Sequence, residues 1–148
     1  MSETLPLPST ARSLPIALLR ARERVMGPIR AMLADVGITE QQWRVLRVLH
    51  EAGPLDPTRI ADRACLLLPS LTRILQKLTD KGLIVRAPDR IDRRKQVISI
   101  TQEGVALIED NLATSLEIMD RLKQQMGEDR FEALLDLLNE LDETSVSS

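Results

Sequence analysis

The sequence predicts a mainly α-helical protein with one short β-hairpin. Two observations indicate this fold class. Apolar residues recur at intervals of three and four through most of the 148 residues, which is the pattern of amphipathic helices. The exception is the segment 83–100, where two short apolar runs flank the polar stretch APDRIDRRKQ, as in a hairpin. The length fits one domain, or one domain with an added assembly element.

The first helix is expected to begin after Ser13, with Pro15 in its first turn. Its apolar residues recur at roughly helical spacing: Leu14, Leu18, Val25, Ile29, Met32, Leu33 and Val36. A proline inside a helix removes a hydrogen bond and clashes with the preceding turn. The pair Gly27-Pro28 therefore predicts a kink or a break near residues 24–28.

Three shorter helices are expected next. Residues 39–42, TEQQ, form a capping box that opens the second helix, and Gly53-Pro54 ends it. Asp56 before Pro57 opens the third, whose inward side chains are expected to be Ile60, Ala61, Ala64 and Cys65. The fourth is expected to run from Pro69 to Gly82 with a buried stripe formed by Leu71, Ile74, Leu75 and Leu78.

The strands of the hairpin are expected at residues 83–86 and 97–100, with Pro88 and Asp89 in the turn. Thr101 then caps a long helix, whose apolar register is interrupted at Ser115, and a last amphipathic helix carries Phe131 to Leu141. The expected organisation is a terminal helical segment (1–38), a central module (39–101) and a second helical segment (102–148).

Charge is unevenly distributed along the chain. The formal net charge is −2, but residues 59–95 carry ten Lys or Arg and four Asp or Glu, and residues 96–148 carry three and twelve. A net charge of +6 in one segment of an acidic chain is typical of a surface that binds a polyanion. Charge alone also fits a solvated surface on which cations cluster by chance.

Two consecutive short helices followed by a basic hairpin form the layout of a winged helix-turn-helix, in which the second helix enters the DNA major groove. Arg73 is suited to guanine and Gln76 to adenine. The outward residues of the fourth helix are the candidate contacts: Ser70, Thr72, Arg73, Gln76 and Lys77. The hairpin tip adds candidates for the minor groove or the phosphates: Arg90, Arg93, Arg94 and Lys95. Asp92 is expected to pair with Arg94 or Arg86.

The stretches LTRILQKLTDKGLIVR and DRRKQVISITQEG resemble the MarR family of transcriptional regulators. The shared pattern is an L-T-R step at residues 71–73, Gly82 before the first strand, a D-x-R tip at residues 92–94, and a T-x-x-G entry at residues 101–104. The resemblance covers about residues 14–142. It implies a homodimer with interlocked terminal helices that binds palindromic double-stranded DNA.

A narrower resemblance connects IALLRARERVM, ITEQQWRVLRVL and RACLLLPSLTRIL to the MarR-family repressors of homoprotocatechuate degradation. It implies a repressor of an aromatic-acid catabolic operon, with an aromatic carboxylate as the effector. Such a ligand needs a cation and a flat apolar wall, and the candidates are Arg20, Arg22, Arg24 and Trp43. The A-R-E step at residues 21–23 favours Arg22. The alternative is that Trp43 belongs to the core and these arginines pair with carboxylates.

Other functions have less support in the sequence. No Gly-rich phosphate loop, G-x-S-x-G or H-E-x-x-H occurs, so no enzyme, cofactor or metal site is expected, and Cys65 is expected to be a buried small apolar residue. A single cysteine, no secretion signal and no long apolar segment favour a cytoplasmic protein without membrane contact. Two alternatives remain: a helical dimeric protein-interaction module, and a MarR-like regulator of another ligand or stress response.

Overall fold

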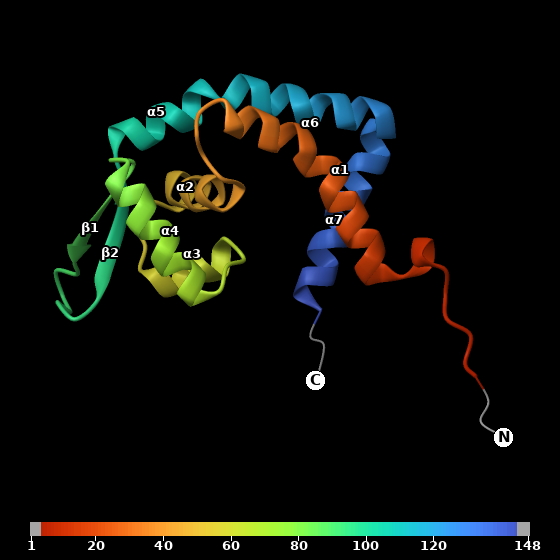
Figure 1. Ribbon diagram of the computed structural model, residues 1–148, viewed down its shortest axis with the longest axis horizontal. Helices are drawn as coiled ribbons and strands as arrows, with labels where there is room; N and C mark the ends of the chain where they lie inside the picture. Colours follow the sequence, from red (N-terminus) through yellow and green to blue (C-terminus); the bar gives the residue numbers. More distant parts are fainter. Residues whose placement is uncertain (1–3, 145–148) are drawn as a thin grey trace. The chain divides into compact units, whose positions relative to one another are not determined.

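The computed structural model of the protein describes residues 4–144 (Figure 1). Its elements are, in chain order, η1 (Thr10–Arg12), α1 (Leu14–Ala34), α2 (Glu40–Ala52), α3 (Pro57–Arg63), α4 (Leu68–Asp80), β1 (Ile84–Pro88), β2 (Gln96–Ile100), α5 (Gln102–Asp110), α6 (Leu112–Met126) and α7 (Glu128–Glu143). The fold class is mainly helical with a two-stranded antiparallel sheet, as the sequence predicts. The chain divides between Leu112 and Ala113 into two compact units. The termini of the expected outer segments, residues 1–3 and 145–148, lie outside the described residues.

Helix α1 runs through Pro28 without interruption, so of the kink or break predicted near residues 24–28 the break does not occur. The turns on the far side of the proline bury Ile29, Met32 and Leu33, and this packing offsets the one backbone hydrogen bond that proline cannot make. Ser13 occupies the N-cap position as predicted, although its side chain makes no capping hydrogen bond.

The helix starts of the central module follow the sequence signals. The hydroxyl oxygen of Thr39 accepts a hydrogen bond from the Gln42 amide at 3.1 Å, and Oε1 of Gln42 accepts one from the Thr39 amide at 3.2 Å, which confirms the capping box. Asp56 caps α3 by accepting from the Arg59 amide at 2.9 Å. Helix α4 begins one residue earlier than predicted, at Leu68.

Cys65 is exposed, so its predicted burial is wrong. Helix α3 ends at Arg63, two residues before the cysteine, and the expected inward position assumed that the helix continued. Cys65 instead lies in the turn before α4, with a φ of 54°, a left-handed backbone conformation that non-glycine residues seldom adopt.

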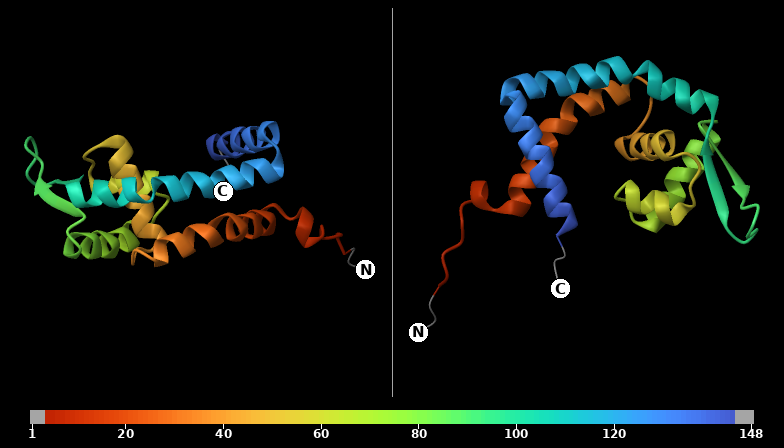
Figure 2. Two further views of the ribbon diagram at one scale, coloured as in Figure 1. Left: turned by 90° about the horizontal axis from the view of Figure 1, so that it is seen from above. Right: turned by 180° about the vertical axis from the view of Figure 1, so that it is seen from behind.

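The core of the first unit lies where the end of α1, helices α2 to α5 and the hairpin meet (Figures 1 and 2). Its fully buried side chains are Leu33, Val45, Leu46, Leu49, Ile60, Leu71, Leu78, Ile84 and Ile98. In the sheet Ile84 pairs with Ile100 and Pro88 with Gln96. Leu55, just before α3, exchanges backbone hydrogen bonds with Ile98 on β2 at 3.1 and 2.8 Å, and this bridge ties the hairpin to the helices.

The base of the hairpin is also joined closely to α5. The Thr101 hydroxyl donates to the carbonyl oxygen of Gly82 at 2.7 Å and accepts from the Gly104 amide at 3.1 Å, so the predicted cap is confirmed. A Cβ atom at Gly104 would overlap the carbonyl oxygen of Leu83 and lie 2.6 Å from Cγ1 of Ile100. Only glycine allows α5 to approach the strands this closely.

The single long helix expected after Thr101 is instead interrupted at Asn111, between α5 and α6. The Asn111 side chain donates to the carbonyl oxygen of Leu107 at 2.8 Å, and local bonds of this kind compete with regular helical bonding. In the second unit, α7 confirms the last predicted helix. Its large apolar residues remain substantially exposed: Leu134, Leu135, Leu137, Leu138 and Leu141.

Among residues 4–144, none of the helices combines the length and the apolar character that crossing a membrane requires.

Candidate nucleic-acid interface

Helix α4 presents its predicted contact residues on one exposed face. Leu71, Leu75 and Leu78 are buried, and this anchoring fixes which side of the helix meets solvent. Five polar side chains are exposed as predicted: Ser70, Thr72, Arg73, Gln76 and Lys77. Ile74, predicted to be buried, is half-buried at the edge of this face.

These polar side chains differ in how far they are already engaged. Thr72 donates its hydroxyl to the carbonyl oxygen of Leu68 at 3.2 Å, and Nε2 of Gln76 donates to Oδ1 of Asp80 at 2.9 Å. Ser70, Arg73 and Lys77 make no side-chain hydrogen bond or ion pair with any residue between positions 4 and 144. The two cations of α4 are therefore available to an external anion.

The hairpin tip has a defined shape because two aspartates organise its backbone. The Asp89 carboxylate accepts hydrogen bonds from the amides of Ile91, at 2.7 Å, and Asp92, at 3.2 Å. These two bonds lower the pKa of Asp89. The Asp92 carboxylate accepts from Nε and from the backbone amide of Arg94, both at 3.1 Å, and these bonds lower the pKa of Asp92.

The predicted partner of Asp92 is thus Arg94. Arg86 instead donates from Nε to the Thr79 hydroxyl on α4 at 3.3 Å. The Arg94 side chain remains 91% exposed, and an ion pair this exposed contributes little energy. Arg90, Arg93 and Lys95 are exposed and form no ion pair within the described part of the chain. All four tip cations can therefore reach a partner.

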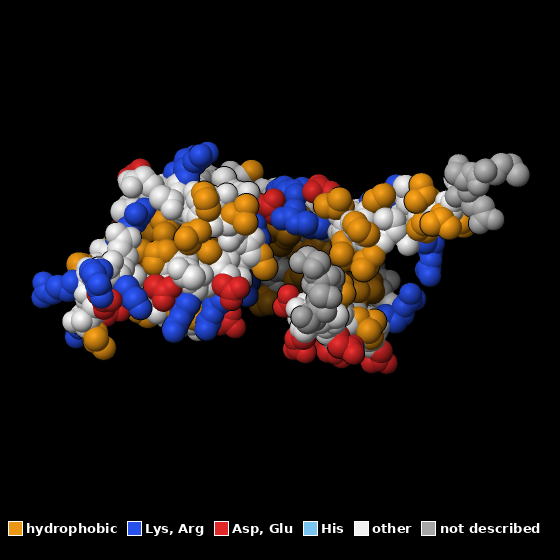
Figure 3. All heavy atoms as spheres, turned by 90° about the horizontal axis from the view of Figure 1, so that it is seen from below, with side chains coloured by type: hydrophobic (Ala, Val, Ile, Leu, Met, Phe, Trp, Pro, Cys, Tyr) orange, Lys and Arg blue, Asp and Glu red, His pale blue; other side chains and the backbone are white. Residues whose placement is uncertain are grey.

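The helix α4 and the hairpin form one basic surface because they belong to the same packed unit. β1 packs against α4, and Figure 1 shows the helix beside the base of the hairpin. Figure 3 shows blue side chains gathered at the hairpin end of the molecule. The structure thus brings together the two groups of cations that the sequence places about 20 residues apart.

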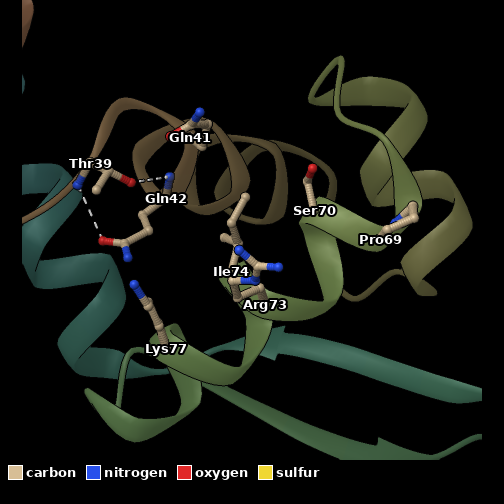
Figure 4. A pocket seen from close by; sticks show the side chains of 8 residues that line it. All are labelled: Thr39, Gln41, Gln42, Pro69, Ser70, Arg73, Ile74 and Lys77. Atoms are coloured by element: carbon tan, nitrogen blue, oxygen red, sulfur yellow. Dashed lines mark hydrogen bonds between the residues drawn. The ribbon is translucent and has the colours of Figure 1, made fainter.

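A hollow of about 330 Å³ extends this surface between the start of α2 and the exposed face of α4 (Figure 4). Thr39, Gln41 and Gln42 line it from α2, and the α4 side is lined by Pro69, Ser70, Arg73, Ile74 and Lys77. In Figure 4 Lys77 extends from α4 toward the start of α2. In the sequence Thr39 and Gln41 are recognisable only as parts of a helix cap, and no local signal connects them with lining residues of α4 that lie about 30 or more positions away.

Two of the four candidate ligand residues, Arg22 and Trp43, lie at the contact between α1 and α2. Nη2 of Arg22 forms an ion pair with Glu40 at 2.6 Å, and Nη1 lies 4.0 Å from Glu23. Trp43, one turn after Glu40, is only 7% exposed. Arg20 donates to the Thr10 hydroxyl at 3.0 Å, away from this contact. Arg24 is exposed and has no ion-pair partner among residues 4–144.

Arg30 completes an ion-pair network at this contact and is absent from the sequence-based candidates. It pairs with Glu23 at 2.8 Å and with Glu40 at 3.5 Å. The hydrogen bond from Arg30 lowers the pKa of Glu23, and the same bond raises the pKa of Arg30. Arg22 and Arg30 of α1 therefore both pair with Glu40 of α2 and with Glu23 of their own helix, and Arg22 is engaged by carboxylates of this chain.

Comparisons with known proteins connect this geometry to a family. The model of the MarR family matches residues 38–95. The chain is 39% identical to the HTH-type transcriptional regulator FarR of Neisseria gonorrhoeae, over 93% of this chain and 94% of that protein. It is 40% identical to the homoprotocatechuate degradative operon repressor of Escherichia coli, over 86% of each chain. The crystal structure of NadR in complex with 4-hydroxyphenylacetate is similar over 95% of this chain and all of that chain, with 38% identity and a TM-score of 0.82.

Proposed function

The chain belongs to the MarR family, and from this premise we propose that it is a transcriptional repressor that binds palindromic double-stranded DNA as a homodimer. A small aromatic carboxylate acts as its effector and releases it from the DNA. The proposed organisation keeps residues 39–101 as the DNA-binding module, with residues 1–38 and 102–148 supplying the dimer contacts. Its curated relatives are regulators, and no catalytic role is proposed.

The exposed face of α4 carries this proposal. Arg73 and Lys77 on the helix, together with the four cations of the hairpin tip, form a positive surface on a chain whose net charge is −2. Arg73 offers the two-pronged donor that fits O6 and N7 of guanine. Gln76 fits adenine when its side-chain amide releases its hydrogen bond to Asp80 and bonds to the base edge instead. The tip cations suit phosphates and the narrow minor groove.

The dimer follows from the apolar side chains that one chain leaves uncovered. On α1 these are Leu14, Leu18 and Leu19, and α7 exposes its leucine row. A second copy of the chain would cover them, and the two-fold symmetry of a homodimer matches a palindromic site.

The effector class is drawn from the relatives. One acts on a homoprotocatechuate operon by name, and a similar structure holds 4-hydroxyphenylacetate. The proposed site is the α1–α2 contact, where Arg22 supplies the cation and Trp43 a flat wall. The carboxylate of the ligand would replace Glu40 at Arg22. Arg20 and Arg24 are the remaining candidates on α1.

The test is a band-shift or anisotropy titration on the DNA upstream of the gene for this protein. Specific binding should fall steeply with salt, because bound cations release counterions from the phosphates, and should be reversed by 3,4-dihydroxyphenylacetate or 4-hydroxyphenylacetate. DNA binding without any sequence preference would reject the proposal that the protein is an operator-specific repressor. Specific binding that ignores every phenylacetic acid would reject the effector class alone.

A further inference from the structure

The hollow between α2 and α4 lies directly beside the face of α4 that the proposed function places on DNA. Three of its lining residues, Ser70, Arg73 and Lys77, belong to that face. The inference below rests on the proposed function, since it names a further contact made in the same complex.

The side chains around the hollow are suited to an anion. Lys77 and Arg73 bring two positive charges, and neither is paired with a carboxylate in the described residues. Ser70 adds a hydroxyl and Gln41 an exposed amide. No Asp or Glu side chain lines the hollow. The side-chain oxygen of Gln42 is occupied, because Oε1 accepts from the Thr39 amide and from Lys81, both at 3.2 Å, whereas its Nε2 donates to no group within residues 4–144.

The backbone at the start of α2 adds donors of the same kind. The capping box satisfies the amide of Gln42, and the Trp43 amide donates to the carbonyl oxygen of Thr39 at 2.9 Å. The amides of Glu40 and Gln41 belong to the first turn, where helical N–H groups have no intrahelical acceptor. Within residues 4–144 neither amide donates to any other group.

The anion that fits this position is a phosphate of the DNA backbone. A helix lying in the major groove has a sugar-phosphate strand along each edge of the groove, and phosphate contacts fix its register. The hairpin packs against α4 through its strand β1, and the hollow opens between α4 and α2. We propose that this hollow holds a backbone phosphate of the bound DNA, with Gln41 and Lys77 as its donors and Arg73 left to reach the base edge.

The decisive variant is Gln41→Glu, which places a carboxylate where the phosphate would lie. Gln102→Glu is the matched control, because Gln102 is an exposed glutamine in the first turn of α5 and does not line the hollow. An acidic side chain in the first turn of a helix favours folding, so both variants should keep the wild-type melting temperature.

The measurement uses a duplex selected from a random library with the wild-type protein, and a scrambled duplex of equal length. Gln41→Glu should weaken binding to both by the same factor, at least about tenfold for a lost bond to a charged group, because a phosphate carries no sequence information. Gln102→Glu should bind both duplexes as wild type does. Gln41→Ala is a second, milder variant that should lose affinity in the same uniform way.

Single phosphates of the selected duplex are then replaced, in both half-sites, by neutral methylphosphonates. At the contacted phosphate the wild type should lose affinity, whereas Gln41→Glu should gain affinity, because the substitution removes a repulsion. This reversal of sign identifies the phosphate. Any of three outcomes would overturn the inference. Gln41→Glu could bind DNA as tightly as Gln102→Glu does, or it could lose affinity for the selected duplex alone. The third outcome is that no methylphosphonate position weakens the wild type and strengthens Gln41→Glu. A wild type that prefers no duplex would overturn the proposed function as well.

Discussion

Arg73→Ala tests whether α4 reads a base. Arg73 is exposed and makes no described contact inside the chain, so its removal should leave the melting temperature unchanged. A two-pronged bond to guanine is worth about 1–3 kcal/mol. At about 1.4 kcal/mol for each factor of ten, the affinity for the selected duplex should fall roughly 5-fold to 150-fold.

The loss should be confined to one position in each half-site. Titrations against duplexes that carry each of the four bases at every position should show that Arg73→Ala no longer distinguishes the bases at that position. Arg73→Lys is the matched control, because lysine keeps the charge and lacks the planar fork of donors. It should retain affinity for scrambled DNA and still lose the base preference. An equal loss on every sequence would refute base reading and make Arg73 a phosphate contact.

Arg94→Ala should reduce the slope of log affinity against log salt by about one unit, and an unchanged slope in salt titrations would remove the hairpin tip from the DNA interface. Gly104→Ala should destabilise the fold by about 1–3 kcal/mol through overpacking, whereas Gly27→Ala, where no neighbour lies within 4 Å of the added Cβ, should stabilise α1 by about 0.5–1 kcal/mol; urea unfolding that ranks them in the opposite order would contradict the packing argument. Leu19→Glu on the 63% exposed position of α1 should yield a folded monomer, and a sedimentation result showing an intact dimer would exclude this face. Arg22→Ala should keep DNA binding and lose the response to 3,4-dihydroxyphenylacetate; calorimetry that finds equal binding by variant and wild type would exclude Arg22 as the anchor.

Most of the fold is predictable because its signals are local. The capping box at residues 39–42 and the caps at Asp56 and Thr101 each involve residues within one helical turn. The differences from the predicted helices have two kinds of cause. Pro28 is tolerated through tertiary packing, because the turn that follows it is buried. Asn111 interrupts a helix through a local side-chain bond to Leu107, which an apolar pattern does not encode.

The candidate site also has a part that local sequence signals predict and a part that depends on tertiary packing. The outward face of α4 is predictable, since the leucines that point inward determine which residues point outward. Neither the hollow that Gln41 and Lys77 both line nor the position of Arg30 beside Glu40 could be predicted, because each depends on how two separate helices pack. The same limit applies to Arg22, whose ion pair with Glu40 joins residues 18 positions apart.

Because Gly104 lets α5 pack closely against the base of the hairpin, the segment from α2 to α5 can be exchanged as one unit between related proteins. Backbone and side-chain hydrogen bonds hold the strands to the helices on both sides: Leu55 bonds to Ile98, and Thr101 bonds to Gly82 and Gly104. The first interruption of the helix that follows the strands is at Asn111. If residues 39–110 were exchanged between two related proteins, all of these hydrogen bonds would therefore stay within the exchanged segment. The resulting chimaera should prefer the operator of the protein that supplied residues 39–110. The part of its effector preference that depends on α1 should be that of the protein that received them.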